Sequence, residues 1–129
     1  MKNKTAFTLV WVILSFFQIT SLEAQPKLEF SQERGFYKSS FQLYIKSNDP
    51  GATIKYTLDG SDPRNSHYAQ TSISPAELTI DPYINKGRAI TAGVVVRACA
   101  LSNGDTSKTV TQSYIFLSEV KFQERCFFT

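Results

Sequence analysis

Apolar and polar positions alternate over many short stretches of this chain, and turn residues separate those stretches. The clearest alternation places Phe41, Leu43 and Ile45 on one face of a strand. A period of two is typical of a β-strand with one buried face. Further strands are predicted at residues 28–30, 54–58, 94–101 and 110–117. Many short strands with frequent turns predict an all-β, immunoglobulin/fibronectin type III-like β-sandwich.

Other stretches have a weaker pattern. Gly35 lies in a short segment where we expect the chain to bend. Between residues 68 and 80 we expect Ile73, Leu78 and Ile80 to point inward, and residues 81–92 are predicted to form a longer loop. The inward face of the strand at 94–101 is predicted to consist of Val94, Val96, Ala98 and Ala100, with Val95, Arg97 and Cys99 on the other face. Residues 102–105 are predicted to form a hairpin turn.

The segment Ile54–Pro63 combines a strand with a distinctive turn. Ile54, Tyr56 and Leu58 form an apolar face, and Asp59, Gly60, Ser61, Asp62 and Pro63 follow directly. Asp-Gly tolerates positive φ, and proline lacks the amide donor that continued strand pairing needs. We therefore expect a buried Tyr56 and a tight turn that ends the strand.

The first 24 residues have the features of a signal peptide. Lys2 and Lys4 precede an apolar run from Leu9 to Phe17, and Ala24 offers a small residue before a cleavage point. The apolar run is short for a membrane span, although an uncleaved anchor is the alternative. The sequence thus predicts a secreted, cell-surface or periplasmic protein with one sandwich domain at 28–117. Residues 118–129 are predicted to be a tail or a truncated continuation.

The charge pattern argues against two classes of partner. The chain has a net charge of +3 at pH 7. Its basic residues are interspersed with acidic ones and form no run that could follow a phosphate backbone, so nucleic-acid binding is not expected. After signal cleavage, no amphipathic basic helix is predicted that could bind a membrane surface.

The two cysteines allow two interpretations. Cys99 lies in an apolar strand and Cys126 in the terminal segment. Export would permit a disulfide between them. The pattern favours a buried free thiol at Cys99 and an unpaired or intermolecular Cys126.

Candidate chemistry is sparse. Asp59, Ser61 and Asp62 offer oxygen atoms to a calcium ion, but that ion needs six or more ligands, so we expect these side chains to bond their own turn. His67 is the only histidine and lies in a predicted loop. No nucleophile elbow, paired carboxylates or phosphate-binding loop is present in the sequence, so we predict no catalytic residues, metal or cofactor.

Aromatic side chains leave sugar binding open, because an aromatic face can stack on a pyranose ring. The candidates are Tyr37, Tyr68 and Tyr83, with Tyr44 as a further exposed position. The only tryptophan, Trp11, belongs to the predicted signal, which weakens this hypothesis.

The order of motifs resembles a known module. Gly35-Phe36-Tyr37, Pro50-Gly51-Ala52-Thr53, the strand and turn at 54–63, Val95–Ala100 and Tyr114 follow one another as in the chitobiase/β-hexosaminidase carboxy-terminal domain. That β-sandwich is also found attached to family 29 glycoside hydrolases (fucosidases). The resemblance covers roughly residues 28–117.

Two of these motifs suggest a narrower relative. Gly35-Phe36-Tyr37 and Tyr114–Leu117 are similar to the sandwich that precedes CotH-type kinase-like domains in large secreted bacterial proteins. The resemblance implies a non-catalytic accessory or spacer module from a larger extracellular protein, whose partner is an adjacent domain. A carbohydrate-binding module for polysaccharide is the alternative.

Overall fold

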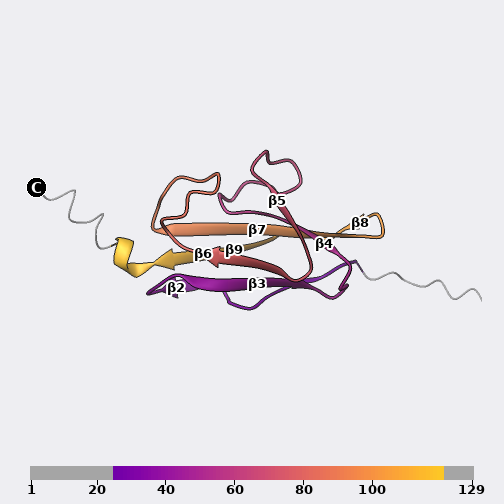
Figure 1. Cartoon of the computed structure of the whole chain (residues 1–129), viewed down its shortest axis with the longest axis horizontal. Coiled ribbons are helices and arrows are strands. Elements are labelled where there is room, and N and C mark those ends of the chain that lie inside the picture. The colour runs from indigo at the N-terminus through magenta and orange to yellow at the C-terminus, as the bar shows by residue number, and fades with distance from the viewer. Residues whose placement is uncertain (1–24, 121–129) are drawn as a thin grey trace, which may run out of the picture.

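The computed structural model describes residues 25–120, which form two stacked β-sheets. The smaller sheet has the strand order β1-β3-β6, with bounds β1 Leu28–Phe30, β3 Phe41–Ser47 and β6 Ala76–Ile80. Figure 1 shows β3 in one layer and the long strand β7 in the other. The predicted immunoglobulin/fibronectin type III-like sandwich is confirmed.

The larger sheet has six strands in the order β2-β9-β7-β4-β5, and β8 pairs with β7 beside this path. Its strands are β2 Gly35–Tyr37, β4 Thr53–Thr57, β5 Gln70–Ile73, β7 Gly93–Ser102, β8 Asp105–Thr106 and β9 Val110–Phe116. The predicted hairpin turn joins β7 to β8, where Asn103 and Gly104 both have positive φ.

Apolar residues of both sheets meet in one core. Leu43, Ile45 and Ile80 from the smaller sheet are fully buried, as are Ile54 and Val96 from the larger one. Tyr56 and Tyr114 are buried as predicted, with 8% and 0% of their surface exposed. The alternation seen in the sequence therefore identifies the core faces of the long strands.

One edge of the larger sheet is formed by a strand that the alternation did not predict. The segment in which Gly35 was expected to bend the chain is strand β2, and β2 runs parallel to β9. Gly35-Phe36-Tyr37 has no apolar–polar alternation, unlike Leu28–Phe30, so the pattern indicated no strand there. The pairing joins segments that lie far apart in the sequence.

The expected inward position of Ile73 is wrong, because 69% of its surface is exposed. Ile73 ends β5 in the larger sheet, whereas Leu78 and Ile80 lie in β6 of the smaller sheet and are buried. The chain passes from one sheet to the other at residues 74–75, so the alternation of β5 does not continue into β6.

The described chain enters and leaves the sandwich at opposite ends. Lys27 donates its amide to the Asn48 side chain at the end where β7 meets β8. Residues 117–120 form one helical turn at the other end, where Gly93 of β7 pairs with Ile115 (Figure 1). None of the helical structure between residues 25 and 120 is long and apolar enough to cross a bilayer. The predicted signal at 1–24 and most of the predicted tail at 118–129 lie outside the described residues.

Candidate functional site

The turn after β4 is held by its own side chains. The Asp59 carboxylate accepts hydrogen bonds from the Ser61 amide at 3.0 Å and from the Ser61 hydroxyl at 2.6 Å. Asp62 accepts the Arg64 amide at 3.0 Å. The expectation that these oxygens bond their own turn is confirmed, and no group of three or more potential metal-ligating side chains occurs among residues 25–120.

The electrostatics of Asp59 agree with this structural role. Partial burial acts to raise the pKa of its carboxyl, but the hydrogen bonds from Ser61 outweigh burial and leave the pKa below its usual value. The carboxylate is thus ionised at neutral pH and serves as an acceptor inside the turn.

The turn also docks on β7. The Gly60 amide donates to the Val95 carbonyl at 3.1 Å, and the Gly60 carbonyl accepts from Arg97 Nη1 at 3.2 Å. Gly60 has a φ of 79°, as the sequence predicts for this position. Arg97, expected on the outward face of its strand, is half-buried by these contacts. The motif 56–63 therefore fastens the loop to the sheet.

Three of the candidate tyrosines are exposed. Tyr68 has 57% of its surface exposed, Tyr83 has 61% and Tyr44 has 44%. Tyr68 packs against Gly87, so the loop that follows β4 touches the loop at 81–92, which carries Tyr83. The Tyr83 hydroxyl donates to Glu119, while the Tyr44 hydroxyl donates to Glu77 at 3.2 Å on the smaller sheet. The structure thus brings Tyr68 and Tyr83 onto neighbouring loops and leaves Tyr44 on another sheet.

Tyr37 has a different environment from the other candidates. Its ring stacks on Phe41 with centroids 4.3 Å apart and meets the edge of Tyr114 at 5.6 Å. Its hydroxyl donates to the Glu33 carbonyl at 2.7 Å. Because both neighbours pack against the ring, Tyr37 belongs to the edge of the hydrophobic core, and its ring is less available for stacking on a sugar than those of Tyr68 and Tyr83.

Arg88 organises the loop at 81–92 and had no signal in the sequence analysis. Its guanidinium donates to the carbonyls of Pro82, Ile84, Thr91 and Gly93 at 2.7–3.1 Å. Burial lowers the pKa of Arg88 and the nearby Asp81 carboxylate partly offsets that effect. The Arg88 side chain therefore stabilises one conformation of the loop at 81–92.

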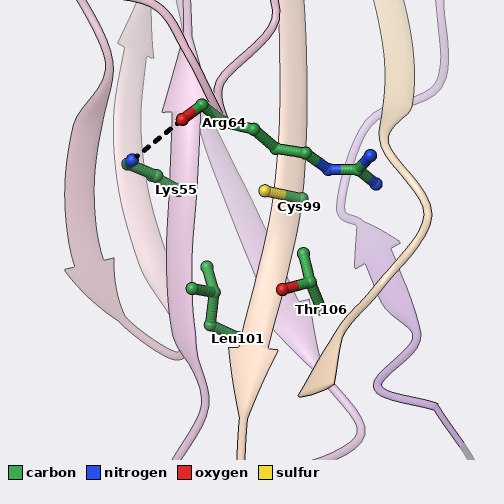
Figure 2. Close-up of a pocket in the computed structure, with 5 residues that line it drawn as sticks. All are labelled: Lys55, Arg64, Cys99, Leu101 and Thr106. Atoms are coloured by element: carbon green, nitrogen blue, oxygen red, sulfur yellow. Dashed lines mark hydrogen bonds between the residues drawn. The ribbon is translucent and has the colours of Figure 1, made fainter. Parts of the chain in front are cut away.

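A hollow of about 430 Å³ lies on the outer face of the larger sheet. Figure 2 shows its lining, which comprises Lys55 from β4, Cys99 and Leu101 from β7, Thr106 from β8, and Arg64 from the loop after β4. The Arg64 side chain extends across β7 and donates from Nη2 to the Ser107 carbonyl at 2.9 Å. The sequence did not predict this hollow, because its basic residues Lys55 and Arg64 lie in different segments that only the fold brings together.

Cys99 forms the floor of this hollow and is fully buried, as predicted. It lies on the outward face of β7, where the Arg64 side chain covers it (Figure 2). Burial raises the pKa of the Cys99 thiol, although the Arg64 charge opposes that shift. Cys126, its predicted alternative partner, lies outside the described residues.

Comparison with protein families identifies the domain. A family model described as Fn3 associated matches residues 43–114, more than half of the 129 residues. The chain belongs to the Fn3-associated family. The match runs from β3 into β9 and so includes strands of both sheets. No curated protein and no solved structure was found to match the chain.

Membership in the Fn3-associated family agrees with the fibronectin-like sandwich seen in the structure. It favours a non-catalytic accessory module over an enzyme. In this Fn3-associated domain, Asp59 and Arg88 both direct their hydrogen bonds to their own turn or loop.

Proposed function

We propose that this chain is an exported accessory module that holds adjacent parts of an extracellular protein apart. The observation that carries the proposal is the position of the two ends of the described chain, which lie at opposite ends of the sandwich (Figure 1). The ten residues of β7 connect those ends. At about 3.3 Å per residue, a strand of this length spans roughly 33 Å.

The contacts at each end support a fixed geometry. At one end, the Lys27 amide and the Asn48 side chain are 2.6 Å apart. At the other, the Tyr83 hydroxyl bonds Glu119 in the last helical turn. Both bonds attach a terminal segment to a loop of the sandwich, which limits the directions in which the chain can leave.

The resemblance to known modules gives the context for this role. The motifs shared with the chitobiase-type sandwich attached to family 29 glycoside hydrolases, and with the sandwich before CotH-type domains, suggest an adjacent domain as the partner. The basic and apolar parts of residues 1–24 support export.

A distance measurement tests the spacer role. Spin labels placed by Lys27→Cys and Ser118→Cys in a Cys126→Ser background keep both end contacts and should give one narrow distance distribution near the length of β7, roughly 33 Å. The control pair, Lys27→Cys with Lys108→Cys, lines one hollow and should give a much shorter distance. A broad distribution for the first pair would contradict a rigid spacer.

Export is tested separately. Residues 1–24 fused to an alkaline phosphatase that is active only outside the cytoplasm should give activity. Leu14→Arg, which interrupts the apolar run, should abolish it. Equal activity with and without Leu14→Arg would contradict a signal peptide.

Carbohydrate binding is the second candidate, and the exposure of Tyr68 and Tyr83 on neighbouring loops favours it. A glycan array should then give a signal that Tyr68→Ala or Tyr83→Ala removes and Tyr44→Ala leaves unchanged. The same array should give no signal at high protein concentration if the module is only a spacer.

A further inference from the structure

The hollow on the larger sheet has the size of a small-molecule site and a mixed lining. Its volume of about 430 Å³ falls in the usual range for ligand pockets, about 300–1,000 Å³. It lies on β4, β7 and β8, with Arg64 from the loop after β4. None of the tyrosines considered for sugar stacking lines it.

Two cationic groups face this hollow. The Lys55 ammonium donates to the Arg64 carbonyl at 3.4 Å, and Arg64 Nη2 donates to the Ser107 carbonyl at 2.9 Å. An ammonium has three donors and a guanidinium has five, so each group retains donors beyond these contacts. Arginine matches the planar geometry of a carboxylate especially well.

The rest of the lining suits a compact body that is partly apolar. Leu101 supplies an exposed apolar surface, whereas Cys99 is fully buried beneath the Arg64 side chain, and the Thr106 hydroxyl lines the hollow from β8 (Figure 2). A sugar ring presents C–H groups on its faces and hydroxyls at its rim, so it complements such a surface. A bare inorganic anion would use only the cations.

The charges of both basic groups reach the floor of the hollow. Burial keeps the pKa of the Cys99 thiol raised, the Arg64 and Lys55 charges act to lower it, and the Asp62 carboxylate acts to raise it. Asp62 is the opposing acid, but its carboxylate accepts the Arg64 amide within the turn. The charged groups that act on Cys99 are therefore Arg64, Lys55 and Asp62, and the Asp62 carboxylate is hydrogen-bonded within the turn.

A second basic hollow adjoins the first. Lys27 and Lys108 line a space of about 310 Å³ together with Ser107, whose carbonyl accepts the Arg64 hydrogen bond. Lys27, Arg64 and Lys108, from three segments of the chain, thus all lie close to Ser107. Such an arrangement favours a ligand that carries repeated negative charges.

We propose that the hollow lined by Lys55, Arg64, Leu101 and Thr106 binds a carboxylate-bearing sugar unit of an acidic polysaccharide. The carboxylate lies between the two cations, and the ring lies against Leu101. This proposal gives the accessory module a ligand, and it holds whether or not the module acts as a rigid spacer.

The test uses the chain purified after expression from its full sequence, with immobilised polygalacturonate as the probe and dextran as the neutral comparison. We expect binding to polygalacturonate and none to dextran. Lys55→Met combined with Arg64→Met should weaken binding about tenfold or more, because both charge-assisted contacts are lost. Lys46→Met combined with Arg34→Met removes the same charge at exposed sites elsewhere and should change affinity by less than about twofold.

A second variant keeps both cations and so tests the site itself. Thr106→Glu places a negative charge in the hollow and should also weaken binding, whereas Thr79→Glu on the smaller sheet should not. Thermal melts check that all four variants are folded. Equal losses in the site and control variants, binding to dextran, or full competition by millimolar inorganic phosphate would each overturn the proposal.

Discussion

Gly60 allows the energetic cost of a tight turn to be divided into two parts. Its φ is 79°, and a Cβ added there would lie 3.2 Å from Val95 Cγ1 and 3.4 Å from Val95 Cβ. Gly104 has a φ of 87°, but an added Cβ would meet nothing within 4 Å. The two glycines therefore share the backbone requirement and differ in the space around them.

The expected magnitudes follow from these distances. A left-handed conformation costs a non-glycine residue about 1–2 kcal/mol. Alanine recovers about 0.4–1 kcal/mol by restricting the unfolded chain, so Gly104→Ala should lower the free energy of unfolding by about 1 kcal/mol. Gly60→Ala adds the crowding against Val95, and overpacking of this kind costs about 1–3 kcal/mol. We expect a total of roughly 2–4 kcal/mol for Gly60→Ala.

Urea denaturation of the single variants and of the double variant Gly60→Ala/Val95→Ala measures both parts. Val95→Ala removes the atom at 3.2 Å and leaves only Cβ at 3.4 Å, so the cost of Gly60→Ala in that background should fall toward that of Gly104→Ala. Equal costs for the two glycines in the original background, or no relief from Val95→Ala, would refute the assignment of crowding to this contact.

Three further predictions concern other buried groups. Tyr56→Ala should lower the free energy of unfolding by about 3–5 kcal/mol in urea denaturation, while exposed Tyr44→Ala should cost under about 1 kcal/mol. Burial raises the pKa of Tyr114 above its ordinary 10.0, so folding favours the neutral phenol: stability is full below pH 10 and falls as pH rises above it. Tyr114→Phe should flatten this alkaline loss, and a pH series of melts in which both chains lose stability equally would contradict the assignment. Arg88→Met should speed hydrogen exchange of amides in the loop at 81–92, because three carbonyls of the loop and that of Gly93 lose their donor, and unchanged exchange there would argue against that role.

The sequence predicted those parts of the fold that depend on alternation and turn chemistry. Phe41–Ile45 and Val94–Ala100 are long enough for their period of two to identify the buried face. Gly60 and the 102–105 turn have residues suited to positive φ, so the local backbone was predictable too. Each of these features depends on neighbours in the sequence.

The sequence did not predict contacts between distant segments. Ile73 was misplaced because the change of sheet at residues 74–75 has no signature in the alternation. Strand β2 has three residues, and its pairing depends on β9. The Lys55–Arg64 hollow depends on the path of one long side chain across β7 (Figure 2). Such features depend on contacts between segments that only the folded chain brings together.

The place of β9 in the larger sheet has a consequence for biosynthesis. β9 lies between β2 and β7, and both of its neighbours pair with it through backbone hydrogen bonds. A nascent chain that ends before residue 110 therefore lacks the strand that joins β2 to β7. β2 is among the first strands to be synthesised, yet it has no partner in the larger sheet until all the other strands of the sandwich have been made.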